Sequence, residues 1–101
     1  NMPCSADAIN HFKQSNTYFG PGKAANAGGV AVSQFEMAQN ASMQSWPKSD
    51  VDEKLQNVMT HIFTTVSDTA NEYGCENDLA TGANIAGFKR VAAAMIAQGV
   101  V

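Results

Sequence analysis

Long apolar runs are absent from this chain of 101 residues. Its longest uninterrupted apolar stretch is the heptapeptide 91–97, well short of the roughly 20 residues that a membrane-spanning helix needs. The chain also lacks the basic and apolar opening segments of a secretory signal peptide. We therefore expect no membrane partner and predict a cytoplasmic protein.

Positive charge is scarce as well. Six lysine and arginine residues stand against nine aspartate and glutamate residues, which gives a net charge of −3. The basic residues are scattered along the sequence and form no cluster that could follow a phosphate backbone. Nucleic acid is therefore not an expected partner.

Cysteine and histidine are too few and too far apart for a metal site. The two cysteines, Cys4 and Cys75, lack the CxxC spacing of zinc and redox motifs, and we predict that they are free thiols in a reducing compartment. His11 and His61 each lie within a predicted helix and have no histidine, glutamate or cysteine three or four residues later to complete a metal pair. No catalytic residue and no metal ligand are predicted within this chain.

Helical periodicity is what the sequence does contain. Small polar residues stand before apolar stripes with helical spacing, and glycine follows two of these stripes. The pattern predicts four helices: residues 5–14, Asn26 to before Trp46, Ser49 or Asp50 to Gly74, and the end of the 75–81 loop to before Gly99.

One short segment favours a strand. The trio Thr17–Tyr18–Phe19 is β-branched and aromatic, and the turn-forming sequence Gly20–Pro21–Gly22 follows it. A lone strand leaves its backbone groups unpaired, so we expect it to join a sheet outside these residues. The expected fold is mainly α with one or two short strands, and residues 1–101 form a single domain or a fragment of one.

Adjacent glycines, Gly28 and Gly29, occupy the start of the predicted second helix, where glycine costs about 1 kcal/mol relative to alanine. One explanation is close helix packing through small residues. The other is a ligand site, because a helix start presents unpaired N–H groups and glycine lets a ligand approach them. Ser33, one turn later, would add a hydroxyl donor. Composition leaves both explanations open.

The segment around these glycines, KAANAGGVAVSQFEMAQN at 23–40, resembles the C-terminal end of the small hexameric glutamate dehydrogenases. So do NMPC at 1–4, FGPG at 19–22, GANIAGF at 82–88 and MIAQG at 95–99, which follow in the same order along the whole chain. The resemblance implies the C-terminal portion of a Rossmann-like α/β NAD(P)-binding domain, together with the closing C-terminal helices.

The resemblance also implies ligand contacts for five residues. Asn1 and Asn26 match cofactor-binding asparagines near the nicotinamide end of NAD(P). Gly29, Val30 and Ser33 match the helix start that lines the substrate pocket. In that family the serine hydroxyl donates to the side-chain carboxylate of glutamate or 2-oxoglutarate.

The implied function is one part of a glutamate dehydrogenase, which interconverts L-glutamate with 2-oxoglutarate and ammonium by NAD(P)-dependent oxidative deamination. NADP is expected rather than NAD, and the parent enzyme is expected to be a homo-oligomer, a hexamer in this family. The catalytic lysines, the acid–base aspartate and the pyrophosphate loop precede this region in the family. We therefore expect the chain to be inactive without the remainder of the enzyme. The alternative is a non-catalytic helical interaction module.

Overall fold

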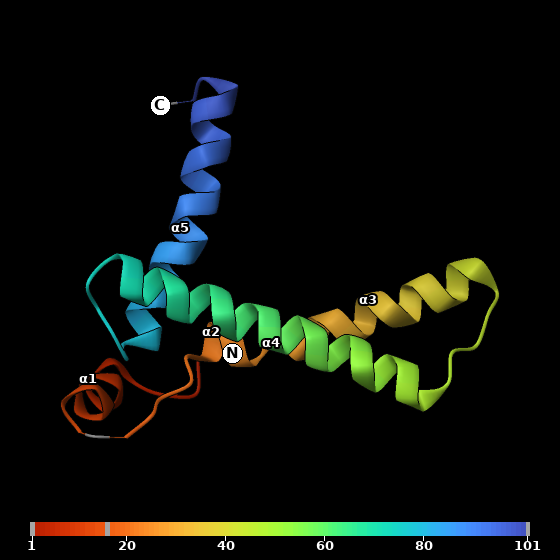
Figure 1. Cartoon of the computed structure of the whole chain (residues 1–101), viewed down its shortest axis with the longest axis horizontal. Helices are drawn as coiled ribbons and strands as arrows, with labels where there is room; N and C mark the ends of the chain where they lie inside the picture. The colour runs from red at the N-terminus through yellow and green to blue at the C-terminus, as the bar shows by residue number, and fades with distance from the viewer. Residues whose placement is uncertain (1, 16, 101) are drawn as a thin grey trace.

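The computed structural model of the chain describes residues 2–15 and 17–100. Within these ranges all regular structure is helical (Figure 1). The elements are α1 (Ala6–Gln14), α2 (Gly22–Ala25), α3 (Ala27–Ser42), α4 (Lys48–Glu72) and α5 (Leu79–Gln98). The four predicted helices are confirmed, while the short α2 was not predicted and α5 begins within the segment expected to be a loop.

The predicted fold class is wrong, because the described residues contain no strand. Neither the short strands nor the Rossmann-like α/β portion that the resemblance implied is present in them. Residues 17–19 are irregular, since a strand needs a neighbouring strand to pair its backbone groups. Phe19 instead stacks on Phe12 of α1, with ring centroids 5.3 Å apart and planes 11° apart. The aromatic ring of Phe19 therefore packs the loop against α1.

Helix ends follow local capping chemistry in part. The Ser5 hydroxyl accepts from the backbone N–H of Ala8 at 3.3 Å, which confirms the predicted start of α1. Asn26 occupies the N-cap position of α3, but its side chain makes no capping bond. Pro47, and not Ser49 or Asp50, precedes the first residue of α4. Proline suits this place because it has no N–H to leave unpaired.

The longest helix, α4, is the centre of the structure. The first turn of α3 packs against residues 55–59 of α4, and the first turns of α5 pack against residues 66–70. The second contact is the tightest: a Cβ on Gly82 would lie only 2.5 Å from the carbonyl oxygen of Val66. Glycine is therefore required where α5 crosses α4.

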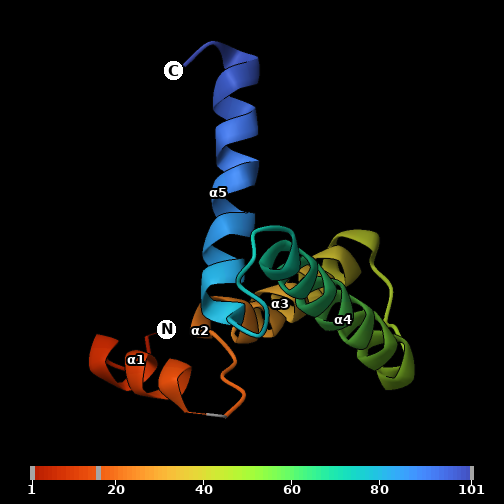
Figure 2. The same ribbon diagram turned by 60° about the vertical axis from the view of Figure 1, so that its left-hand side comes forward.

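Little of the chain is deeply buried. The buried hydrophobic residues are Ala31, Val66, Ala70 and Ala83, all small or medium in size. The Cα radius of gyration is 16.5 Å, whereas a compact domain of this length has about 13 Å. Figures 1 and 2 show the reason, because the second half of α5 extends away from the other helices.

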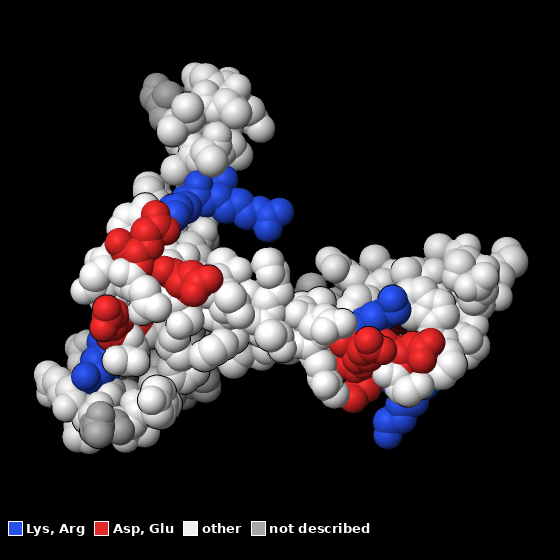
Figure 3. Space-filling view, viewed as in Figure 1, with Lys and Arg blue, Asp and Glu red and all other residues white. Residues whose placement is uncertain are grey.

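The extended half of α5 is apolar and uncharged beyond Arg90 (Figure 3). Phe88, Val91 and Ile96 are 71%, 58% and 67% exposed. No helix in residues 2–15 and 17–100 combines the length and the apolar character needed to cross a membrane.

Candidate functional site

Three of the predicted site residues lie together on the first two turns of α3. Gly29, Val30 and Ser33 are all exposed, and a Cβ built on Gly29 would meet no atom within 4 Å. The Ser33 hydroxyl donates to the carbonyl oxygen of Gly29 at 3.1 Å. It must rotate away from this carbonyl before it can donate to a ligand.

The two neighbouring glycines have different surroundings. A Cβ on Gly28 would lie 3.3 Å from Sδ of Met59 and 3.4 Å from Cδ1 of Leu55, so Gly28 allows α3 to approach α4 closely. Gly29 faces open space and has no such packing role. Helix packing thus explains the first glycine and leaves the second available to a ligand.

The predicted cofactor residue Asn26 lies at the junction of two helices. Its backbone N–H donates to the carbonyl oxygen of Gly22 at 2.9 Å, and its own carbonyl accepts from Gly29 at 3.2 Å. It is therefore the last residue before α3 and closes α2 at the same time. Asn1, the other predicted cofactor residue, lies outside the described residues.

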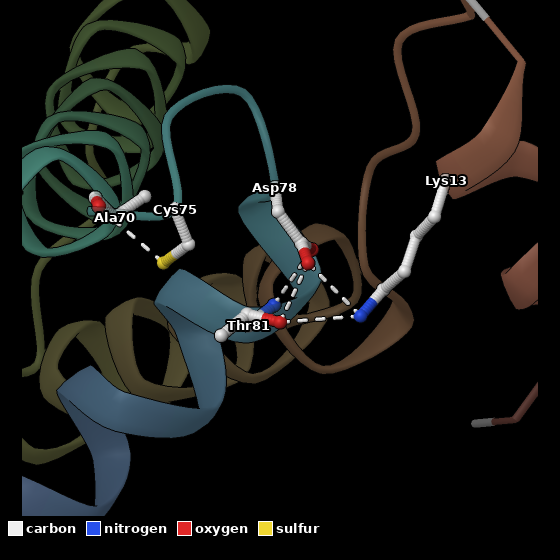
Figure 4. Close-up of polar contacts among 5 residues, drawn as sticks. All are labelled: Lys13, Ala70, Cys75, Asp78 and Thr81. Carbon is white, nitrogen blue, oxygen red and sulfur yellow. Dashed lines mark hydrogen bonds and ion pairs between the residues drawn. The ribbon is translucent and has the colours of Figure 1, made fainter. Parts of the chain in front are cut away.

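A polar cluster that the sequence did not predict joins α1 to the start of α5 (Figure 4). Lys13 Nζ lies 2.9 Å from Asp78 Oδ2 and 3.1 Å from Thr81 Oγ1. Asp78 also accepts from the backbone N–H and the hydroxyl of Thr81, at 3.0 and 2.6 Å, and so caps α5. The one local signal was an aspartate three residues before a threonine, within the segment predicted to be a loop.

Hydrogen bonding controls the ionisation of Asp78. Partial burial favours the neutral carboxyl, but the hydrogen bonds from Thr81 and the ammonium of Lys13 outweigh it. The pKa of Asp78 is consequently lower than its ordinary value of 3.8. Asp78 is therefore ionised at neutral pH, and its contact with Lys13 joins α1 to α5.

One turn further along α5, a second lysine makes a similar contact. Lys23 Nζ of α2 donates to Oδ1 of Asn84. Lys13, Lys23 and Asn84 line a hollow of about 310 Å³ whose apolar walls include Met2 and Phe19. A second hollow of about 300 Å³ lies beside it, around the loop after α1. Gly29, Val30 and Ser33 line neither hollow.

Metal chemistry has no support in the described part of the chain, where no three histidine, cysteine or acidic residues form a group able to hold a metal ion. Cys4 and Cys75 are free thiols. The thiol of Cys75 donates to the carbonyl oxygen of Ala70 at 3.3 Å, at the end of α4 (Figure 4). This contact gives Cys75 a structural role in the α4–α5 turn.

Comparison with known proteins identifies the family. The model of the Glutamate/Leucine/Phenylalanine/Valine dehydrogenase family matches residues 1–99. The chain belongs to this family. The resemblance seen in the sequence is therefore confirmed, and it rests on nearly the whole chain.

Individual members of the family are close in sequence. The chain is 56% identical over 100 residues to the NADP-specific glutamate dehydrogenase of Helicobacter pylori, covering 99% of the chain and 22% of that protein. It is 46% identical over 101 residues to the NAD-specific glutamate dehydrogenase of Clostridium symbiosum, with coverages of 99% and 22%. The chain thus spans about a fifth of the length of these relatives.

Solved structures of related proteins contain the same fold. A structure of glutamate dehydrogenase matches 100% of the chain and 23% of its own length, at a TM-score of 0.86 and 45% identity. The glutamate dehydrogenase of Plasmodium falciparum matches with a TM-score of 0.87 and 50% identity, over 97% of this chain and 21% of that one. The arrangement of helices is therefore one that these enzymes contain.

Proposed function

We propose that the chain is a segment of a glutamate dehydrogenase that catalyses the reversible NAD(P)-dependent oxidative deamination of L-glutamate to 2-oxoglutarate and ammonium. The observation that carries this proposal is the 56% identity to a relative named as a glutamate dehydrogenase. The family model alone spans enzymes for four amino acids, so the names of individual relatives favour glutamate among them.

Within that enzyme, the start of α3 is the proposed wall of the substrate pocket. Gly29 lets a ligand approach the backbone, Val30 presents an exposed apolar side chain, and Ser33 supplies a hydroxyl on the same face. Because the Gly29 N–H donates to the Asn26 carbonyl oxygen, the donor proposed for a substrate carboxylate is the Ser33 hydroxyl. Asn26, and Asn1 outside the described residues, are the proposed cofactor contacts.

The proposed cofactor is NADP. Relatives from Helicobacter pylori and Giardia intestinalis are named NADP-specific, although the Clostridium symbiosum relative is named NAD-specific. The parent enzyme is proposed to be a homo-oligomer located in the cytoplasm.

The chain by itself is proposed to be inactive, because catalysis requires groups positioned around the substrate that it does not carry.

The test uses the full-length parent protein. We expect it to oxidise NADPH when 2-oxoglutarate and ammonium are both present, with slower oxidation of NADH. The 2-oxo acids that correspond to leucine, phenylalanine and valine serve as competing substrates. A higher kcat/KM for any of these would overturn the assignment to glutamate, and turnover by the 101-residue chain would contradict its proposed inactivity.

A further inference from the structure

We propose that Lys23 is a positioning residue for the start of α3. Its hydrogen bond to Asn84 fixes α2 against α5, and α2 in turn holds Gly29, Val30 and Ser33 in place. The inference rests on the proposed function, because it gives these three residues their proposed contact with substrate.

The first step is the coupling of α2 to α3. One residue, Asn26, separates them, and its backbone hydrogen bonds reach back to Gly22 and forward to Gly29. Its φ and ψ of −79° and −8° are close to helical values, so the two helices follow each other without an intervening loop. A displacement of α2 therefore moves the first turn of α3.

The second step is the weakness of α2 on its own. It has four residues, and Pro21 before it provides no side-chain cap. A single helical turn is not stable in isolation, because nucleation fixes several residues for each hydrogen bond gained. The residues of α2 are only partly buried or exposed, so contacts with other elements determine its position. Lys23 makes the side-chain contact that reaches α5.

The third step is the rigidity of the acceptor. Asn84 follows Gly82 and Ala83, which are buried where α5 crosses α4. Because a Cβ on Gly82 would come within 2.5 Å of the Val66 carbonyl oxygen, the two helices lie in close contact at this crossing. Asn84 therefore projects from the best-packed part of the structure. A group that is hydrogen-bonded to Asn84 is held in a defined position.

The fourth step concerns charge. Within residues 2–15 and 17–100, ion pairs join Lys13 to Asp78 and Lys89 to Glu72, and Lys23 has a neutral amide as its partner. Its contact is therefore a charge-assisted hydrogen bond between an ammonium and an amide oxygen, and a substitution that removes the ammonium removes the contact.

The experiment uses the full-length parent enzyme with Lys23→Met, Lys23→Arg, Asn84→Ala and the Lys23→Met/Asn84→Ala double variant. We expect Lys23→Met to raise the KM for 2-oxoglutarate about three- to tenfold, the effect of losing one exposed hydrogen bond, with kcat changed by less than about twofold. Lys23→Arg should restore the KM, because the guanidinium keeps a donor. The double variant should have a KM for 2-oxoglutarate no higher than that of either single variant, since all three variants lose the same contact.

The matched control is Lys89→Met, which removes an exposed lysine further along α5 that donates to Glu72 of α4. It should leave the KM unchanged. Hydrogen exchange gives a readout that needs no activity: amides of residues 27–33 should exchange faster in Lys23→Met and not in Lys89→Met.

Three results would overturn the proposal: an unchanged KM in Lys23→Met, additive effects of the two single substitutions, or unaltered exchange at residues 27–33. A failure of the proposed function is distinguishable, because the unsubstituted parent would then not turn over 2-oxoglutarate. The exchange comparison would still decide the role of Lys23 in that case.

Discussion

The two adjacent glycines at the start of α3 have different surroundings. Gly28 contacts Leu55 and Met59 of α4, while Gly29 faces open space. Helix packing therefore accounts for Gly28, whereas the ligand explanation stays a prediction for Gly29. Ser33 stands on the open side, and its hydroxyl is the group from which an effect on substrate affinity is expected.

Replacing Ser33 with alanine in the full-length enzyme should raise the KM for 2-oxoglutarate about tenfold and leave the KM for NADPH unchanged. A hydrogen bond to a charged carboxylate is worth about 1.5–3 kcal/mol, and the lower limit of this range corresponds to about tenfold. Steady-state kinetics with each substrate varied in turn provide the measurement.

The control for Ser33→Ala is Ser42→Ala. Ser42 lies at the other end of the same helix, and its hydroxyl also donates to a backbone carbonyl, that of Gln39 at 3.0 Å. Both substitutions remove an exposed hydroxyl with the same local bond. If the two variants show equal KM values for 2-oxoglutarate, Ser33 does not contact the substrate.

Asp78 supports a prediction about pH. Its pKa is lower in the folded protein than its ordinary 3.8, so the ionised carboxyl stabilises the fold at neutral pH and this contribution is lost as the pH falls below 3.8. Asp78→Asn keeps a good N-cap oxygen but loses the ion pair with Lys13, which is a partly exposed contact worth about 0.2–1 kcal/mol.

Thermal unfolding of the full-length protein from pH 7 to pH 3 provides the check. We expect Asp78→Asn to be less stable than the unsubstituted protein at pH 7 and the difference to shrink below pH 3.8. Asp68→Asn, which alters an exposed carboxylate outside both ion pairs, is the matched control. A difference that stayed constant across this range would show that the charge of Asp78 does not stabilise the fold.

Between helices, the crossing of α4 and α5 depends on one missing side chain. Gly82→Ala would place its Cβ 2.5 Å from the Val66 carbonyl oxygen and 2.9 Å from the Ala70 Cβ. The neighbouring atoms are a backbone oxygen and another Cβ, so neither can move without shifting a helix. We expect a loss of about 1–3 kcal/mol in the free energy of unfolding, typical of overpacking.

Gly87→Ala is the matched comparison on the same helix. A Cβ at this position meets nothing within 4 Å, and alanine is about 1 kcal/mol more favourable than glycine in a helix. The two glycine-to-alanine substitutions should therefore change stability in opposite directions. Urea unfolding of the full-length protein measures both, and a stabilising Gly82→Ala would refute the close approach of α4 and α5.

The helices were predictable because their signals are local. The cap at Ser5, the apolar stripe of α4 and the glycine before position 100 lie within a few residues of the structure they determine. The short α2 has no periodicity to detect in four residues. The strand at 17–19 was predicted wrongly. The β-propensity of its residues reflects their side chains, whereas a strand forms only where a neighbouring strand pairs with its backbone.

The site was predictable only in part, for a related reason. The resemblance selected Gly29, Val30 and Ser33, and the structure places them on one exposed face. The contacts from Lys13 to Thr81 and from Lys23 to Asn84 join residues 68 and 61 positions apart. No spacing rule connects such residues, because their proximity follows from how the helices pack.

For the molecule as a whole, the exposed surface is large for its mass. The chain exposes 7530 Å², whereas a compact monomer of 10.7 kDa exposes about 5,500 Å². The excess of about 2,000 Å² exceeds what one partner contributes to an ordinary interface, about 800 Å². Exposed apolar side chains on α5 are part of this excess.

We expect the isolated 101-residue chain to form dimers or larger assemblies in water, since the exposed apolar side chains of α5 favour association. Sedimentation at increasing concentration measures this. Replacing Phe88 and Ile96 with glutamate should shift the population towards monomers, whereas the same change at the polar positions Gln34 and Asn57 should not. A single monomeric species at high concentration would contradict the prediction.

The close approach at Gly82 also has a mechanical consequence. From this crossing to Gln98, α5 continues for 16 residues, about 24 Å at 1.5 Å per residue, with few supporting contacts. This part of α5 would therefore turn as one rigid piece about the crossing. A rotation of about 5° there would carry the far end about 2 Å, so the width of one absent methyl group governs the position of the most distant part of the helix.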